Sequence, residues 1–231
     1  MTLMTIADFR PHAVVFDLDG TLVDNMAIHA DAFVDFAARH GLPELTLDIR
    51  RRIDGKRNSE IFPLLFNRPM SMDEVLVYEE EKEGAYRRLS AGRLRPVSGA
   101  VELLDALGAR GIPVAVATSA PEKNVTHTLR ESGLAARLPI VARGDEVPNG
   151  KPFPDVFLKA AEKLGVPPES CLAFEDAPIG VEAVVRAGMR CIAVTTTFTA
   201  EQFAQHEPRP EAVVRDYVEY LDTYGSWLRD G

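Results

Sequence analysis

Two carboxylates, Asp17 and Asp19, stand at alternate positions between the apolar run 14–16 and Gly20. The run predicts a short buried strand, so both acids fall at a strand end. Placing like charges together at the edge of a core is costly, because they repel and lose solvation. A divalent cation between them would offset this cost, since hard cations take oxygen ligands. The spacing points to a cation-dependent site, although two surface acids after an edge strand would give the same pattern.

Polar side chains also follow three further apolar runs. They are Thr118 and Ser119 after 112–117, Lys151 in the loop after 139–142, and Glu175 and Asp176 after 172–174. Because the carboxyl ends of parallel strands gather at one edge of a sheet, we expect these groups to converge. Carboxylates, a hydroxyl and an ammonium suit phosphoryl transfer, in which positioning and charge neutralisation do most of the catalysis.

Taken singly, each later motif also has a purely structural interpretation. Thr118 and Ser119 before a proline are typical of a helix cap, as is Glu175 at the start of the next predicted helix. Lys151, in a Gly-Lys-Pro sequence, would serve equally well as a solvated turn residue. Their joint occurrence, each after a predicted strand, favours the catalytic interpretation.

Outside residues 25–91 the chain alternates between short apolar runs and segments with helical spacing. The runs show little polar alternation, which is typical of parallel strands covered on both faces. The predicted strands lie near 12–17, 112–117, 139–142, 172–174, 192–195 and 212–214. We therefore predict an α/β fold, a Rossmann-like parallel sheet core with helices on both faces.

Residues 25–91 show helical spacing and no convincing strand. The predicted helices cover about 26–40, 44–53, 58–66 and 73–89. We interpret this block as an inserted all-helical cap domain. Residues 1–24 and 92–231 then form the α/β catalytic core, and residues 25–91 form the cap.

Lys82 lies on the apolar stripe of the helix 73–89, between Tyr78 and Tyr86 and away from the acids at 79–81 and 83. One interpretation is a lysine whose stem covers apolar surface while its ammonium reaches water. The other is a lysine that faces an active site. Periodicity alone leaves both open.

The 231 residues carry a net charge of −9, which argues against nonspecific nucleic-acid binding. It does not exclude small anionic substrates, because local lysines and a metal can reverse the field in one cleft. We find neither a signal-peptide pattern nor an apolar run of about 18 residues, so we expect a cytoplasmic protein without membrane contacts. We also expect the protein to be a monomer or a weak dimer. Cys171 and Cys191 each open an apolar run and are expected to be buried strand residues.

The segment 17–24, Asp-Leu-Asp-Gly-Thr-Leu-Val-Asp, resembles the first motif of the haloacid dehalogenase-like (HAD) hydrolases. Segments 115–119, 150–155 and 174–180 are similar to the second, lysine and acidic motifs of that family. The likeness covers nearly the whole chain. A helical insertion between the first two motifs resembles the subgroup of β-phosphoglucomutase and small sugar phosphatases, whose cap closes over the substrate.

The resemblance implies catalytic roles for four residues. Asp17 would attack phosphorus and form an aspartyl-phosphate, and Asp19 would protonate the leaving group and later activate water. Thr118 would hold phosphate oxygens, and Lys151 would neutralise charge on the phosphate and on Asp17.

The same resemblance implies Mg²⁺ as the cofactor. Its ligands would be the carboxylates of Asp17 and Asp176 and the backbone carbonyl of Asp19, with Glu175 orienting a metal-bound water. Waters and a phosphate oxygen would complete six ligands.

A substrate-binding set is implied at the boundary of cap and core: Ser119, Asn124, His29, Gly55, Lys56, Arg57 and Lys82. His29 and Lys82 match a histidine and a lysine of β-phosphoglucomutase-like caps, and 55–58 resembles the substrate-specificity loop. The mutase pattern has a lysine just before that glycine and an arginine three residues after it. Here those places hold Asp54 and Asn58, which counts against a mutase.

We therefore expect a Mg²⁺-dependent phosphatase for a small phosphorylated metabolite, with a sugar phosphate as the favoured class. A β-phosphoglucomutase-like mutase with the same phosphoenzyme is the alternative. Dehalogenation needs no Mg²⁺ site and leaves Asp19 unexplained. Phosphonate hydrolysis would need a Schiff-base lysine, for which Lys56 and Lys82 are candidates. A non-catalytic phospho-acceptor is a different class, against which Asp19, Thr21 and the cap count.

Overall fold

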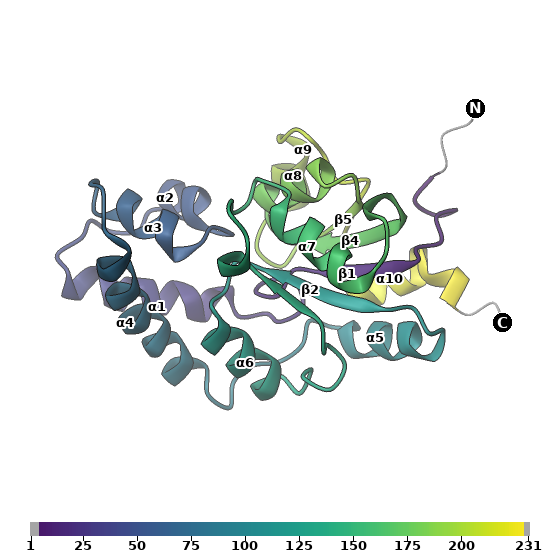
Figure 1. Cartoon of the computed structure of the whole chain (residues 1–231), viewed down its shortest axis with the longest axis horizontal. Coiled ribbons are helices and arrows are strands. Elements are labelled where there is room, and N and C mark those ends of the chain that lie inside the picture. The colour runs from purple at the N-terminus through teal and green to yellow at the C-terminus, as the bar shows by residue number, and fades with distance from the viewer. Residues whose placement is uncertain (1–4, 229–231) are drawn as a thin grey trace.

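The computed structural model describes residues 5–228, except for the side chains at 47, 48 and 51. Its strands are β1 (Ala13–Phe16), β2 (Val114–Thr118), β3 (Val141–Arg143), β4 (Cys171–Glu175), β5 (Arg190–Val194) and β6 (Ala212–Val214). They form one parallel sheet in the order β3-β2-β1-β4-β5-β6. Figure 1 shows this sheet wrapped by helices, which confirms the predicted Rossmann-like α/β fold.

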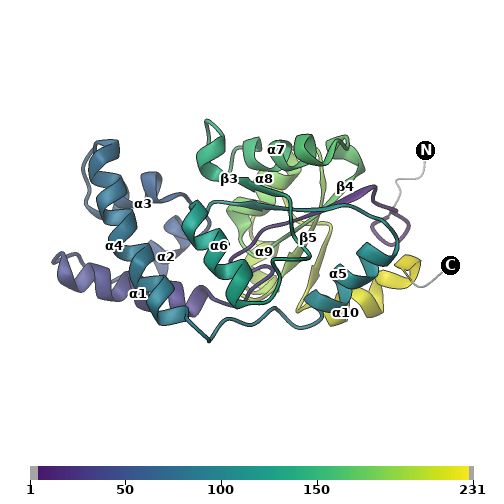
Figure 2. The ribbon, with the colours of Figure 1, turned by 60° about the horizontal axis from the view of Figure 1, so that its bottom comes forward.

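Alternate strand residues enter two apolar layers on opposite faces of the sheet. Val14 and Phe16 join the cluster with helices α5 (Ala100–Ala109), α6 (Glu122–Glu131) and α10 (Tyr217–Thr223). Ala13 and Val15 join the cluster with α7 (Asp155–Leu164) and α8 (Pro178–Arg186). Figure 2 shows α7 and α8 on one side of the sheet and α5 and α10 on the other. Burial on both faces explains why the strands read as continuous apolar runs.

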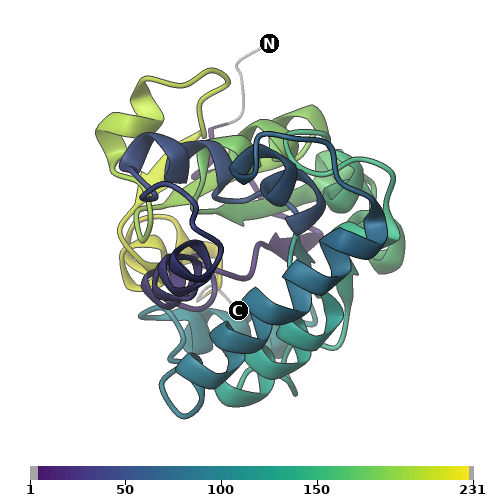
Figure 3. The same ribbon diagram turned by 90° about the vertical axis from the view of Figure 1, so that its left-hand side faces the viewer.

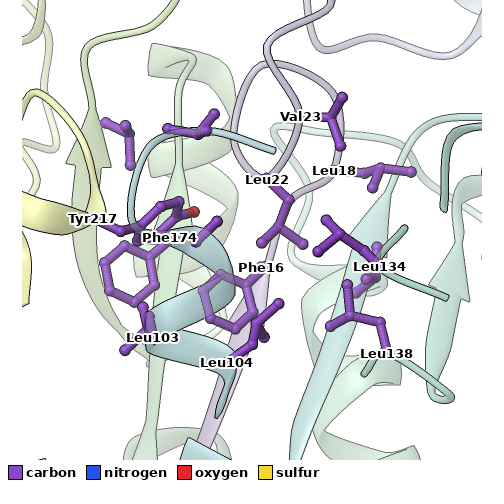
Figure 4. Close-up of a cluster of buried hydrophobic side chains, with 14 of the residues drawn as sticks. Phe16, Leu18, Leu22, Val23, Leu103, Leu104, Leu134, Leu138, Phe174 and Tyr217 are labelled. Atoms are coloured by element: carbon purple, nitrogen blue, oxygen red, sulfur yellow. The ribbon is translucent and has the colours of Figure 1, made fainter. Parts of the chain in front are cut away.

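Phe16 lies at the centre of the first layer. Its ring stacks on Phe174 of the neighbouring strand at a centroid distance of 5.2 Å and meets the edge of Tyr217 at 6.0 Å. Figure 4 shows these rings packed against leucines of α5, with Leu22 and Leu18 above them. This packing fixes β1 beside β4, and therefore fixes where the acidic residues after each strand emerge.

Four helices separate β1 from α5: α1 (Met26–Arg39), α2 (Leu47–Ile53), α3 (Asn58–Leu65) and α4 (Met72–Ser90). They lie together at the end of the molecule away from both termini (Figure 1). A separate apolar cluster holds their outer part, built around Phe33, Phe36 and Phe62. The described residues between 26 and 90 contain no strand, which agrees with the predicted helical block.

The chain enters and leaves this helical block at adjacent points. Val23 and Pro96 form an isolated antiparallel bridge, and the Val97 amide donates to the Leu22 carbonyl at 2.9 Å. Two chain segments held side by side form a natural boundary between the helical block and the rest of the chain. The division into a core (1–24 and 92–231) and a cap (25–91) remains our proposal.

Element ends differ from the predicted ones by a few residues. The third strand begins at Val141 and not at Pro139, because proline lacks the N–H that a strand ladder needs.

Both cysteines are buried strand residues with free thiols, as expected. Within residues 5–228, no helix combines the length and the apolar character that crossing a bilayer would require.

The Phe16→Ala variant tests whether this aromatic packing stabilises the sheet. We expect it to lower the free energy of unfolding by about 3–5 kcal/mol, through lost burial and the cavity left behind. Urea denaturation measures this loss. Val34→Ala in α1 is the control, because Val34 is 60% exposed and its truncation should change stability by less than about 0.5 kcal/mol. Equal effects of the two variants would contradict the packing described here.

Candidate active site

The polar groups that follow the strands do converge. One pocket lies between the sheet edge and the helical block. From the predicted site it brings together Asp17, Asp19, His29, Gly55, Lys56, Lys82, Thr118, Ser119, Asn124, Lys151, Glu175 and Asp176. Arg57 is the predicted member that does not line it. The pocket therefore draws on both parts of the chain.

Lys151 is the electrostatic centre of the pocket. Its side chain is 1% exposed, and its ammonium donates to Asp17 Oδ1 and to Glu175 Oε1, both at 2.6 Å. Burial disfavours the charged form, but Asp17 and Glu175 outweigh burial and hold the pKa of Lys151 above its ordinary value. The ammonium is therefore a fixed positive charge, and the interpretation of Lys151 as a solvated turn residue is wrong.

Glu175 holds the start of α8 as well as Lys151. Its Oε2 accepts hydrogen bonds from the backbone amides of Asp176 and Ala177 at 2.9 and 3.0 Å. Both carboxylate oxygens are thus occupied by protein donors. The Asp176 carboxylate accepts from the Thr21 hydroxyl through Oδ1 at 3.1 Å and lies beside Asp17 and Glu175.

The donor set fits a hard divalent cation. Asp17, Glu175 and Asp176 each offer a carboxylate oxygen within 4.8 Å of the other two. Since Glu175 is already engaged, Asp17 and Asp176 are the candidates for direct ligands. Six-coordinate oxygen sites of this kind are typical of Mg²⁺, which keeps several waters and few carboxylates.

The pKa values show that ionising these buried carboxylates is unfavourable without a cation. Burial raises the pKa of Asp17 to about 7, although Lys151 opposes the rise. Burial, with Glu175 and Asp17 as neighbours, raises the pKa of Asp176 well above its usual range. A bound cation would favour the ionised form of both acids.

The pKa of Asp19 is shifted in the opposite direction. Its Oδ1 accepts from Asn25 Nδ2 at 2.6 Å, and His29 Nε2 lies 3.7 Å away. Burial opposes ionisation, but His29, Asn25 and Lys82 outweigh it and lower the pKa of Asp19. The two carboxylates of this loop therefore have pKa values that their surroundings shift in opposite directions.

Asn25 is a site residue that the sequence motifs did not single out. Besides Asp19, it binds the Gly20 amide through Oδ1 at 3.1 Å and the Tyr86 hydroxyl through Nδ2 at 2.6 Å. It is fully buried and ties the acidic loop to α4. Asn25 directly precedes α1, but its side chain binds the loop and forms no cap hydrogen bond.

Lys82 faces the pocket and does not reach solvent, which decides between its two interpretations. It is 2% exposed, its ammonium lies 2.9 Å from His29 Nδ1 and 3.0 Å from Glu83 Oε1, and it sits 4.0 Å above the Phe33 ring. Glu83 belongs to the acids that lie off the apolar stripe in sequence, yet it is 4% exposed. Asn58 and Asn124 donate to its carboxylate at 2.9 and 2.5 Å.

Thr118 and Ser119 end β2 at the pocket wall. The Thr118 hydroxyl accepts from the Ala120 amide at 3.0 Å, so it has a local structural bond as well as a place in the pocket. The Ser119 hydroxyl donates to the Gly55 carbonyl at 2.7 Å and thereby joins the core to the α2–α3 loop. Asp54 and Asn58, where a mutase would carry cations, also line the pocket.

The chain is similar to known proteins in both sequence and fold. The family description "haloacid dehalogenase-like hydrolase" matches residues 11–188. The match includes every strand-end motif described above, from Asp17 to Asp176.

Two named relatives align along most of the chain. A phosphorylated carbohydrates phosphatase from Thermotoga maritima is 33% identical over 180 residues, with 78% of this chain and 83% of that protein covered. Hexitol phosphatase A from Escherichia coli is 34% identical over 198 residues, covering 80% of this chain and 83% of that protein.

The fold also matches the crystal structure of β-phosphoglucomutase from Clostridium difficile. The TM-score is 0.80, with 96% of this chain and 100% of that chain covered. The sequence identity is 24%, so this match shows a common fold.

The raised pKa values predict how Mg²⁺ stabilisation depends on pH. Asp17 has a pKa of about 7 in the folded protein and 3.8 ordinarily, so the folded state keeps a proton that Mg²⁺ must displace. Mg²⁺ at 100 times its Kd adds about 2.7 kcal/mol, or roughly 5–10 °C in Tm. We expect that shift at about pH 8 and a much smaller one at about pH 5.

Thermal melts with and without Mg²⁺ measure this difference. The Asp176→Asn variant is the control, because it removes a candidate ligand charge and should lose most of the shift at about pH 8. A Mg²⁺ shift of the same size at both pH values, or one retained in the variant, would speak against a cation at these carboxylates.

Proposed function

The chain belongs to the haloacid dehalogenase-like hydrolases, and from that premise we propose a Mg²⁺-dependent phosphatase for a small phosphorylated metabolite. The observation that carries the proposal is the buried contact of Lys151 with Asp17 and Glu175, with Asp176 beside them. A carboxylate can attack a phosphate dianion only if positive charge screens the repulsion. Lys151 supplies such a charge at 2.6 Å from Asp17.

In the proposed first step, a carboxylate oxygen of Asp17 bonds to phosphorus while the ester P–O bond breaks. The electron pair of the broken bond goes to the leaving alkoxide, which takes a proton from Asp19. Mg²⁺, held by Asp17, Asp176 and the Asp19 carbonyl, would supply positive charge to the phosphoryl oxygens. Thr118 and neighbouring backbone amides would hold those oxygens in place.

Asp19 has to act as an acid and then as a base. Its lowered pKa favours the base role, in which it takes a proton from the water that hydrolyses the aspartyl-phosphate. The acid role needs a proton on Asp19 when the substrate is bound. A phosphate dianion beside this carboxylate raises its pKa, because a nearby negative charge disfavours ionisation. His29 and Asn25 keep it oriented in both steps.

The favoured substrate class is a sugar or polyol phosphate. The walls away from the phosphoryl centre carry carboxylates, amides and an imidazole that suit hydroxyl groups, among them Asp54, Asn58, His29 and Asn124. The names of the two relatives, a carbohydrate phosphatase and a hexitol phosphatase, support the same class.

A phosphosugar mutase is the second candidate. Lys56 is the observation in its favour, because this side chain lines the pocket and offers a cation to a second phosphate. Against it, Asp54 and Asn58 line the pocket at the two places where a mutase would carry cations for that second phosphate. We further propose a cytoplasmic protein, monomeric or weakly dimeric, without nucleic-acid or membrane partners.

A substrate panel tests the proposal. Phosphate release from hexose, pentose and hexitol monophosphates is measured with Mg²⁺ and with a chelator, for the wild type and for Asp17→Asn. We expect one of these compounds to be hydrolysed only with Mg²⁺, and Asp17→Asn to lose roughly a thousandfold or more of kcat, because the nucleophile is gone.

Glu169→Gln is a matched control, since Glu169 lies in the 3₁₀ turn Pro168–Ser170 before β4, at the opposite end of that strand from Glu175 and the pocket. Isomerisation of β-glucose 1-phosphate primed by a bisphosphate, in preference to phosphate release, would establish the mutase instead. No turnover of any compound would refute both enzymes and favour a phospho-acceptor without catalysis.

A further inference from the structure

Arg57 belongs to the α2–α3 loop of the helical block, yet its guanidinium is bound by the core. Nη1 donates to the backbone carbonyls of Gly144, Val147 and Pro148 at 3.1, 3.2 and 3.4 Å. Nη2 donates to Pro148 at 3.4 Å. The side chain is 20% exposed and does not line the pocket. The substrate-binding role expected from its place in the loop is therefore not supported by its position.

Glu60 holds this guanidinium in its direction. Its Oε2 accepts from the Arg57 backbone amide at 3.2 Å and from Arg57 Nε at 3.3 Å. The first turn of α3 thereby presents the planar fork of Arg57 to the core. A fork with several fixed donors suits a set of carbonyls better than the single flexible ammonium of a lysine.

The core loop that receives Arg57 leads directly to Lys151. Two glycines make room for the contact. A Cβ on Gly144 would lie 2.9 Å from Arg57 Cδ, and a Cβ on Gly150 would lie 2.7 Å from Arg57 Nε. Gly150 immediately precedes Lys151, whose ammonium holds Asp17. The position of the helical block and the position of Lys151 are therefore joined through one side chain.

A second hydrogen bond connects the same loop of the helical block to the core, and we call this line of contact the Arg57 seam. The Ser119 hydroxyl donates to the Gly55 carbonyl at 2.7 Å, two residues before Arg57. Further contacts between the helical block and the core lie on the last turns of α4, where Tyr86, Arg87 and Ser90 bind Thr128, Asn124 and His127 and form the α4 seam. Figure 3 shows α4 running alongside α6, with α2 and α3 on the other side of the block.

A wider entrance to the pocket requires one of these seams to open. Lys151, Asp17 and Asp176 are 1%, 6% and 3% exposed, so the groups that would meet the phosphoryl unit lie deep in the pocket. The α4 seam adjoins the point where the chain returns to the core at 92–97, and so lies beside the covalent connection. The Arg57 seam has no such connection and is the one free to part.

We propose that Arg57 is a positioning residue that latches the helical block onto the loop before Lys151 and holds the pocket closed during turnover. It touches no reacting atom. When the pocket closes, the Arg57 guanidinium, oriented by Glu60, binds the carbonyls of Gly144, Val147 and Pro148. This contact positions Lys151 and the α2–α3 loop against the substrate at the same time. The inference deepens the proposed phosphatase and rests on it only for its kinetic test.

The test compares Arg57→Ala and Arg57→Lys with Arg68→Ala. Arg68 is the matched control, because it lies in the same helical block, its side chain is 44% exposed, and its guanidinium donates to Glu74 and to the Pro69 carbonyl within that block. Amide hydrogen exchange of segments 54–60 and 144–150 is measured with Mg²⁺ and inorganic phosphate as the probe. The kinetic constants for phosphate release are measured alongside.

We expect Arg57→Ala to speed exchange in both segments by about tenfold, the loss typical of hydrogen bonds to a charged group. Exchange in β1 and β4 and the Tm should stay near wild type. The ratio kcat/KM should fall by about tenfold, mainly through a higher KM. The exchange rates and kcat/KM of Arg57→Lys should lie between those of the wild type and of Arg57→Ala, since lysine keeps the charge but lacks the planar guanidinium.

Exchange in Arg57→Ala that equals Arg68→Ala would overturn the latch. So would faster exchange throughout β1 and β4 with a lower Tm, because Arg57 would then stabilise the fold and not the closed pocket. A wild type that releases no phosphate would instead refute the proposed function, and the exchange comparison would still decide on the latch.

Discussion

A lysine ammonium buried between two carboxylates is the interaction on which the site depends. Removing charges from water is expensive, and the buried Lys151 ammonium is tolerated because Asp17 Oδ1 and Glu175 Oε1 each lie 2.6 Å from it. That distance leaves little tolerance in the placement of β1, β4 and the loop after β3. The apolar layers on both faces of the sheet supply this precision, since Phe16 and Phe174 stack on adjacent strands directly before the acids. Packing and chemistry are therefore linked residue by residue along β1 and β4.

The pocket divides the work between two parts of the chain. The sheet edge carries the groups that would meet the phosphoryl unit. Burial, together with the repulsion between these carboxylates, raises the pKa values of Asp17 and Asp176. The helical block carries the groups that control Asp19, through Asn25, His29 and Lys82. A carboxylate whose ionisation is set by the helical block is sensitive to where that block sits. The Arg57 contact then matters for chemistry, because it fixes that position against the loop of Lys151.

Sequence patterns predicted the sheet and its acidic edge well, because both depend on local features. A short apolar run followed by polar residues marks a buried parallel strand and its carboxyl end, as at 14–19 and 172–176. Side-chain direction depends on tertiary contacts and could not be predicted in the same way. Glu83 stands among exposed acids in sequence but is buried by Lys82, Asn58 and Asn124. Arg57 was expected in the pocket with its neighbour Lys56, and it turns to the core because Glu60 directs its fork there.

The central claim is that Asp17 accepts a phosphoryl group at this edge of the sheet. Reductive trapping tests it most directly. The protein is mixed with its best substrate and Mg²⁺, treated with borohydride, which converts an acyl phosphate to an alcohol, and mapped by peptide mass spectrometry. We predict conversion of residue 17 to homoserine in the wild type, dependent on substrate and Mg²⁺. Turnover of substrate with no modification at Asp17, or with modification at a different carboxylate, would contradict the account.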